Sequence, residues 1–131
     1  LTARHVQLAE HNDQNWENAA QLLAELGLVL DRAENGQICV DMFLHSNVGY
    51  YDAVLMDVRM PVMTGIQATE AIRAMGRSDA KEIPIIAMTA DAFAEDVQRC
   101  LDCGMNAHVA KPIDVDTVAR LLEKHIRMRK G

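Results

Sequence analysis

The chain has 131 residues, of which 50% are hydrophobic, 4% aromatic and 24% charged. A chain of this length buries roughly two-thirds of the surface that it exposes when unfolded, so it forms a core without disulfides or a structural metal. The composition excludes a disordered tail and a disulfide-stapled miniature protein. We expect residues 1–131 to form a single domain, cut from a longer multidomain protein because residue 1 is Leu1 rather than methionine.

The charge balance also excludes partners. With 13 basic and 19 acidic residues the net charge is −6, which argues against direct binding to nucleic acid. No apolar run approaches the roughly 18 residues of a membrane span, so we expect no membrane contact. The odd number of cysteines (Cys39, Cys100 and Cys103) favours a reducing compartment. We therefore expect a cytoplasmic domain, within a parent protein that can itself be membrane-anchored.

Short apolar runs alternate with longer amphipathic stretches five times along the chain, a pattern typical of βα repeats. The apolar runs predict strands at His5–Ala9, Leu28–Asp31, Ala53–Met56, Ile83–Met88 and Ala107–Ala110. The amphipathic stretches predict helices at Gln14–Leu26, after Gly36, at Gly65–Met75, at Ala92–Cys103 and from Asp114 onward. Crossovers of this length produce a parallel sheet with right-handed connections and helices on both faces.

Local signals predict the helix boundaries and the buried faces. Gly27 and Gly104 are expected to end helices, and Thr64 and Asp114 to cap them. Helical spacing predicts that the first helix turns Ala19, Leu22, Leu23 and Leu26 inward, the second Ile38, Cys39, Met42 and Phe43, and the last Val115, Val118, Ala119, Leu122 and Ile126.

Polar side chains gather where the predicted strands end. Binding sites of open parallel sheets lie at that edge, and the residues found there are Glu10, His11, Asn12, Asp13, Asp57, Thr89 and Lys111. Converging carboxylates repel one another unless a cation is present, and Mg²⁺ favours such hard oxygen ligands. A carboxylate neutralised in this way can attack a phosphoryl group, while an ammonium and a hydroxyl offset the charge on the transferred oxygens.

Three segments make the chain recognisable: YDAVLMDVRMPVMTG at Tyr51–Gly65, IPIIAMTADAF at Ile83–Phe93 and CGMNAHVAKPID at Cys103–Asp114. They closely resemble the receiver domain of two-component response regulators, and most of all the receivers fused to hybrid sensor histidine kinases. The resemblance covers essentially the whole chain, since LAEHNDQN at Leu8–Asn15 and AENG at Ala33–Gly36 also fit. It implies a flavodoxin-like (βα)5 fold with strand order 2-1-3-4-5.

The resemblance also implies a role for individual residues. Asp57 would be the phosphoacceptor, Thr89 the switch hydroxyl and Lys111 the ammonium that pairs with the phosphoryl group. Pro112 would follow a cis peptide bond, and His108 stands where the family places an aromatic ring that turns inward on activation. The phosphoryl donor would be the phosphohistidine of a histidine kinase or histidine phosphotransfer domain, which makes the domain a phosphoacceptor rather than a turnover enzyme.

A magnesium site is implied as well, and here the chain departs from the family. Glu10 matches the first of two adjacent acids, Asp57 and the main-chain carbonyl of Arg59 match two further ligands, and His11 replaces the second acid. A neutral imidazole removes one charge and one hard oxygen, so the affinity for Mg²⁺ should fall. Three alternatives remain: Asp57 is phosphorylated with a weakly held metal, the domain is an unphosphorylated pseudo-receiver used for docking or regulation, or Asp13 replaces the lost acid, although Asp13 also suits a helix N-cap.

Two other sites are weaker hypotheses. Cys100 and Cys103 form a C-x-x-C motif, but it lies at the end of a helix, whereas redox pairs use the beginning; with His108 they are one ligand short of a closed zinc site. We interpret them as buried, reduced thiols. A haloacid-dehalogenase-like phosphatase also uses an aspartate at a strand end, but it needs a second aspartate where this chain has Arg59.

Overall fold

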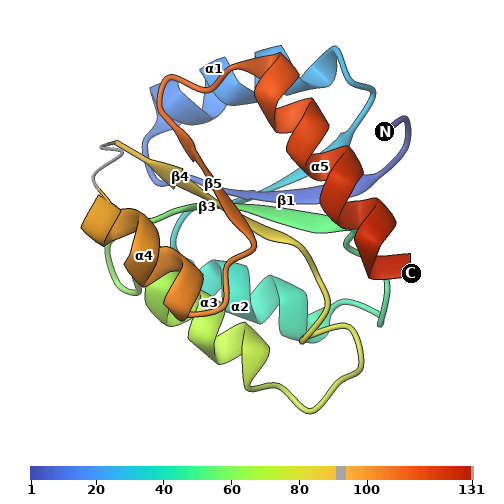
Figure 1. The fold of residues 1–131 in the computed structure, drawn as a ribbon, viewed down its shortest axis with the longest axis vertical. Coiled ribbons are helices and arrows are strands. Elements are labelled where there is room, and N and C mark those ends of the chain that lie inside the picture. The colour runs from blue at the N-terminus through green and yellow to red at the C-terminus, as the bar shows by residue number, and fades with distance from the viewer. Residues whose placement is uncertain (91–93, 131) are drawn as a thin grey trace.

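The computed structural model describes residues 1–90 and 94–130, which form one five-stranded parallel sheet with helices between the strands. The strands are β1 (His5–Ala9), β2 (Val29–Ala33), β3 (Ala53–Asp57), β4 (Ile85–Thr89) and β5 (Ala107–Ala110), in the order β2-β1-β3-β4-β5. The helices are α1 (Asp13–Ala24), α2 (Gly36–His45), α3 (Gly65–Arg73), α4 (Ala94–Asp102) and α5 (Val115–Lys130) (Figure 1). This architecture confirms the predicted flavodoxin-like fold.

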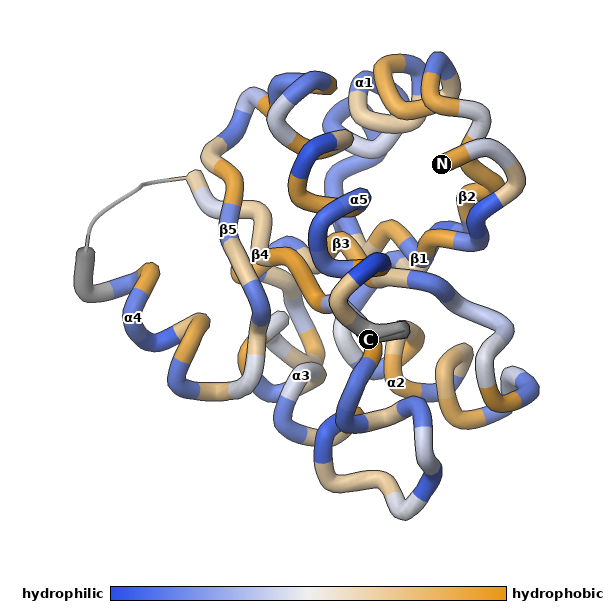
Figure 2. The backbone as a smooth tube through the Cα atoms, turned by 45° about the vertical axis from the view of Figure 1, so that its right-hand side comes forward, coloured by the Kyte–Doolittle hydropathy of each residue, from blue (hydrophilic) through white to orange (hydrophobic). Residues whose placement is uncertain are grey.

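The helices cover both faces of the sheet. Helices α1 and α5 pack on one face, and α2, α3 and α4 on the other (Figure 1). Val54 and Met56 of β3 point to the face of α2 and α3, while Ala53 and Leu55 point to that of α1 and α5. Strands β3 and β4 are buried along their whole length, as expected of parallel strands covered on both sides. The helices instead alternate between hydrophobic and hydrophilic residues (Figure 2).

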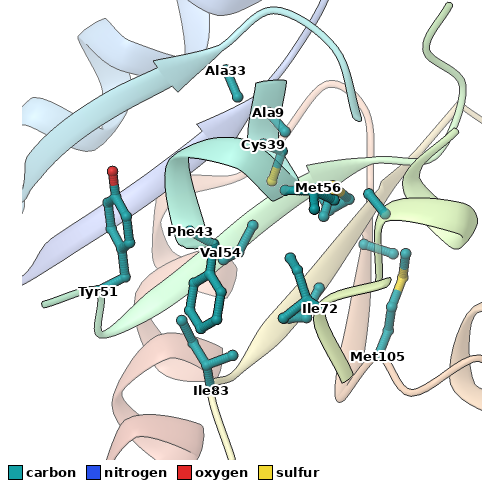
Figure 3. Packing of buried hydrophobic residues seen from close by; sticks show 14 of the residues in the cluster. Ala9, Ala33, Cys39, Phe43, Tyr51, Val54, Met56, Ile72, Ile83 and Met105 are labelled. Carbon is teal, nitrogen blue, oxygen red and sulfur yellow. The ribbon is translucent and has the colours of Figure 1, made fainter. Parts of the chain in front are cut away.

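The core on the face of α2 and α3 is built around large side chains without solvent exposure. Phe43 of α2 belongs to one cluster with Val54, Ile72 and Ile83 (Figure 3). Truncating a buried aromatic side chain of this kind typically costs about 3–5 kcal/mol, so this cluster holds α2 and α3 firmly against the sheet. No helix among residues 1–90 and 94–130 is long and apolar enough to cross a membrane.

Two predictions of helix faces are wrong. Leu22 of α1 and Ile38 of α2 are each 38% exposed, although the spacing predicts that both point inward. The buried residues of α1 are Ala19 and Leu23, and those of α2 include Cys39, Val40 and Phe43. Each helix presents only a narrow stripe to the sheet, so an apolar residue beside that stripe stays at the surface.

Strand boundaries also differ from the prediction. β4 begins after Pro84, which has no N–H to donate to a sheet, although its carbonyl accepts from the Val54 N–H at 2.8 Å. β2 extends to Arg32 and Ala33 because its pairing with β1 continues to that point. The predicted start of α4 at Ala92 lies outside the described residues.

The predicted helix caps are confirmed except at α1. Thr64 forms a capping box with Gln67 at the start of α3, and the Asp114 carboxylate accepts from the Thr117 N–H at 3.2 Å. At α1 the cap is Asn12, whose side chain accepts from the Asn15 N–H at 2.9 Å. Asp13 is the first residue of that helix instead. The β1–α1 loop is therefore one residue shorter than the sequence suggests.

Candidate functional site

A cleft of about 720 Å³ opens at the carboxyl edge of the sheet. In Figure 1 the carboxyl ends of β1 and β4 lie on the left of the molecule. Among the residues that line the cleft are seven singled out in the sequence as strand-end or metal-site residues, namely Glu10, His11, Asn12, Asp57, Arg59, Thr89 and Lys111. The parallel sheet thus places residues from both ends of the chain around one hollow.

At the centre of the cleft, Lys111 links two carboxylates. Its Nζ lies 2.6 Å from Oε1 of Glu10 and 3.2 Å from Oδ2 of Asp57. Both carboxylates are almost fully buried, with residue exposures of 2% for Glu10 and 7% for Asp57. One ammonium therefore serves two acids that are both removed from water.

This shortage of positive charge appears in the pKa of Asp57. Burial and then the nearby Glu10 carboxylate raise the pKa of Asp57 to about 6, and Lys111 offsets only part of that rise. Burial lowers the pKa of Lys111, but its bonds to both carboxylates outweigh burial and raise that pKa overall. The Lys111 ammonium is therefore charged at neutral pH. A further cation near Asp57 would stabilise its ionised carboxylate.

Thr89 and Arg59 complete the surroundings of Asp57. Thr89 ends β4, next to β3 in the sheet, is buried, and its Oγ1 donates a long hydrogen bond of 3.4 Å to the carbonyl of Val109. The main-chain N–H of Arg59 donates to Oδ1 of Asp57 at 3.3 Å. A hydroxyl so loosely held can be recruited by a new acceptor on Asp57.

His108 and Pro112 lie on either side of the lysine. His108 is half-buried in β5, where it pairs with Ala87 of β4. It does not line the cleft. The peptide bond between Lys111 and Pro112 is cis, as the resemblance implies.

His11 and Asp13 stay apart from the pair of buried acids. Both are exposed, although His11 lies on the wall of the cleft. The side chain of Asp13 is 86% exposed and pairs with Arg32 at 2.8 Å. In this arrangement the Asp13 carboxylate contacts Arg32, and Asp13 is not among the residues that line the cleft.

Close backbone contacts at two glycines position the loop after Asp57, and they were not predicted from the sequence. A Cβ on Gly65 would lie 2.3 Å from the carbonyl oxygen of Asp57, and one on Gly36 would lie 2.3 Å from that of Met63. The Met63 N–H also donates to the Pro61 carbonyl at 2.7 Å. Only glycine allows these approaches, so the G in AENG and the G that ends VMTG were the signals available.

All three cysteines lie in surroundings that raise the pKa of their thiols. Cys39, Cys100 and Cys103 are free thiols. Burial raises the pKa of Cys39 to about 12 and also raises those of Cys100 and Cys103, whereas a reactive cysteine has a lowered pKa. Cys100 is buried as predicted, whereas Cys103 is only half-buried.

The donor set fits a hard divalent cation with an incomplete shell. Within residues 1–90 and 94–130, no three His, Cys, Asp or Glu side chains gather closely enough to hold a metal. Glu10 and Asp57 nevertheless face one cleft, and the raised pKa of Asp57 records unmet negative charge. Mg²⁺ is commonly held by one or two carboxylates and several waters, so these residues suit it.

Comparisons with known proteins agree with this geometry. A family profile described as "Response regulator receiver domain" matches residues 6–123. Hybrid signal transduction histidine kinase B of Dictyostelium discoideum is 36% identical over 129 residues, which cover 91% of this chain and 6% of that protein. Two-component system protein A of Emericella nidulans is 38% identical over 122 residues, which cover 92% of this chain and 17% of that protein. The chain thus spans only a small part of these curated relatives.

A solved structure with high similarity is the receiver domain of a sensor histidine kinase from Pseudomonas aeruginosa, with a magnesium ion coordinated in its active-site cleft. It is 34% identical, superposes with a TM-score of 0.85, and the match covers 96% of this chain and 99% of that one. The receiver domain of a signal transduction histidine kinase from Syntrophus aciditrophicus is 25% identical, with a TM-score of 0.81 and coverage of 96% and 92%. The chain belongs to the response regulator receiver domain family of two-component signalling.

Proposed function

We propose that this receiver accepts a phosphoryl group on Asp57 from the phosphohistidine of a histidine kinase or histidine phosphotransfer domain. The observation that supports it best is the buried Asp57 carboxylate, which shares one ammonium with Glu10 and has its pKa raised to about 6. At neutral pH such a carboxylate is still mostly ionised, yet it is more basic than an exposed aspartate. Asp57 is therefore a better nucleophile than an exposed aspartate and is still in its ionised, reactive form.

The positions of these side chains support the following transfer. A carboxylate oxygen of Asp57 bonds to phosphorus, and the phosphorus–nitrogen bond of the phosphohistidine breaks as the imidazole leaves. Lys111, whose Nζ lies 3.2 Å from Oδ2 of Asp57, offsets charge on the transferred oxygens. Water later cleaves the acyl phosphate and restores the carboxylate.

Mg²⁺ is the cofactor we propose, held by Glu10, Asp57 and the Arg59 carbonyl. When bound, it would neutralise charge on the phosphoryl oxygens. The magnesium ion of the Pseudomonas aeruginosa receiver supports this assignment. His11 supplies no hard oxygen, so we expect weaker binding of Mg²⁺ than in a site with a second acid.

Phosphorylation would be read out through the end of the sheet. A phosphoryl group on Asp57 offers an acceptor to the Thr89 hydroxyl, whose present bond to the Val109 carbonyl is long at 3.4 Å. Movement of Thr89 would bias His108 inward and shift the face made by α4, β5 and α5 between two populated states. The signal would then pass to the rest of a parent protein, for which the relatives suggest a hybrid histidine kinase.

A second candidate is a pseudo-receiver that docks or regulates without being phosphorylated. The observation that favours it is His11, an exposed imidazole on the wall of the cleft where the family has an acid. In that case the fold would be retained for binding alone, and Asp57 would remain unmodified.

Phosphorylation with a small donor separates the two candidates. We expect wild-type protein incubated with acetyl phosphate and millimolar Mg²⁺ to gain the mass of one phosphoryl group, which hydroxylamine removes. Asp57→Asn is the matched control, because it preserves the size of the side chain and is expected to gain nothing. Beryllofluoride with Mg²⁺ should also change the fluorescence of Trp16, the single tryptophan. Absence of both responses in the wild type would favour the pseudo-receiver.

A further inference from the structure

Arg32, at the carboxyl end of β2, reaches across to the β1–α1 loop. Its Nε and Nη2 donate to the carbonyl oxygen of Glu10 at 3.3 and 3.2 Å, and Nη2 also donates to the carbonyl of His11 at 3.1 Å. The same Nη2 lies 2.8 Å from Oδ1 of Asp13. The guanidinium thus binds two successive carbonyls of the loop that carries Glu10, and the side chain of the first residue of α1.

These bonds determine how the loop presents Glu10. With both carbonyls turned toward Arg32, the next N–H, that of Asn12, donates to Oε2 of Glu10 at 3.1 Å. The other carboxylate oxygen, Oε1, is then left for Lys111 at 2.6 Å. On the main chain, the Glu10 N–H donates to the Ala33 carbonyl at 3.0 Å. β2 therefore holds Glu10 through its N–H and through its carbonyl.

We propose that Arg32 is a positioning residue for the cation and phosphoryl site, acting through the two loop carbonyls rather than by contact with the ligand. The inference rests on the proposed function of the cleft. The position of Glu10 is important in this chain because residue 11 is a histidine, so Glu10 is the one acid that the loop contributes to the buried cluster. Such outer partners of metal ligands typically change metal affinity by about 10–100-fold when they are removed.

Charge and position predict opposite results at Arg32, which makes the inference testable. Arg32 is a cation behind an anionic cleft, so its removal should strengthen the binding of Mg²⁺ if charge alone mattered. If Arg32 instead holds the loop, its removal should weaken that binding. The sign of the change distinguishes the two effects.

The experiment compares Arg32→Gln, Arg32→Lys and Asp13→Asn with the wild type in Mg²⁺ titrations followed by calorimetry, well below the unfolding temperature of each protein. We expect R32Q to weaken Mg²⁺ binding about tenfold or more. R32K, which can still donate to a carbonyl, should fall between R32Q and the wild type. D13N removes the exposed ion pair and leaves the carbonyl bonds, so it should stay close to the wild type.

A second measurement does not need the metal. Hydrogen exchange at the Asn12 amide reports whether the Glu10 carboxylate is still held, and we expect it to be faster in R32Q but not in D13N. If the wild type neither binds Mg²⁺ nor is phosphorylated, the proposed function fails, and this exchange still tests Arg32.

Three results would overturn the role of Arg32. One is an R32Q protein that binds Mg²⁺ as tightly as the wild type or more tightly. Another is unchanged exchange at the Asn12 amide in that variant. The third is a D13N protein impaired as much as R32Q, because the ion pair would then carry the effect.

Discussion

Two buried aspartates in this domain are each paired with a cation, yet their pKa values move in opposite directions. Asp57, in the cleft, has its pKa raised to about 6, whereas the pKa of Asp79, in the loop before β4, is lowered. Their residue exposures are similar, at 7% and 4%. Burial alone therefore does not decide the outcome; the number of donors for each carboxylate does.

The donors of Asp79 are complete. Burial would raise its pKa, but two bonds from Arg77, at 2.8 and 3.1 Å, and one from the Gly49 N–H, at 2.9 Å, outweigh burial. Arg77 is held in turn by the carbonyl of Phe43 at 2.7 Å and lies over the Phe43 ring at 4.5 Å. This bidentate pair links the loop before β4 to α2 and to the loop that follows α2.

The donors of Asp57 are incomplete. It has a share of one ammonium and a long bond from the Arg59 N–H, at 3.3 Å, and it faces the Glu10 carboxylate. A carboxylate that is fully hydrogen-bonded stabilises the fold, whereas one left short of donors retains the capacity to bind a cation or a phosphoryl group. The number of donors to the carboxylate, and not its depth of burial, therefore distinguishes the two aspartates.

The largest expected effect is the loss of stability in Asp79→Asn. Removing the charge leaves the half-buried Arg77 guanidinium beside a neutral amide, which should lower the free energy of unfolding by about 2–3 kcal/mol at pH 7. Because the folded pKa of Asp79 is lowered, its contribution is complete above the unfolded pKa and is lost as the pH falls through the folded pKa. Urea unfolding of both proteins at neutral and acidic pH measures the difference.

Asp13→Asn is the matched control for that experiment. Its ion pair with Arg32 has the same 2.8 Å separation as Arg77 and Asp79, but the Asp13 side chain is 86% exposed. Exposed pairs contribute little, so we expect D13N to unfold at nearly the same urea concentration as the wild type. Equal losses in D79N and D13N would contradict the distinction between the two sites.

Asp57→Asn should have the opposite sign and a smaller size. The folded pKa of about 6 exceeds that of an unfolded aspartate, so ionised Asp57 lowers stability at neutral pH. Without divalent cations, we expect D57N to be more stable than the wild type by about 1–2 kcal/mol at pH 7.

The pH dependence of the stability gain in D57N tests this explanation. The gain of D57N should be complete above the folded pKa of about 6 and should disappear below the unfolded pKa, where Asp57 is protonated in both states. Unfolding curves at several pH values between these limits, with chelator present, provide the measurement. A variant that is less stable than the wild type at pH 7 would show that Asp57 is as well satisfied as Asp79.

The sequence predicts one of these two aspartates far better than the other. Asp57 follows a dense apolar run, and parallel sheets place such residues at a common edge, so its meeting with Glu10 and Lys111 follows from the strand pattern. Asp79 lies in a polar stretch with no periodicity. Its burial depends on tertiary contacts with Gly49, which no local pattern encodes.

The contacts of the site show the same limit. Arg32 reads as a surface charge at the end of a short strand, and only the pairing of β2 with β1 brings it to the loop carbonyls. Asn12 and Asp13 are both good helix caps by type, so the sequence does not select between them. The strands and the residues at their ends were predictable, whereas the hydrogen-bond partners depend on the tertiary structure.

The smallest expected effect concerns backbone strain beside Asp57. Val62, in the loop between β3 and α3, has φ of +69° and is 81% exposed. A left-handed conformation costs a residue with a Cβ about 1–2 kcal/mol, and glycine gives back about 1 kcal/mol through its freer unfolded chain. We therefore expect Val62→Gly to stabilise the protein by about 0.5 kcal/mol. Val62→Ala keeps the Cβ and should gain nothing, and paired urea curves measure both. If V62A gained as much as V62G, the cost would come from the exposed valine side chain and not from the left-handed backbone at this position.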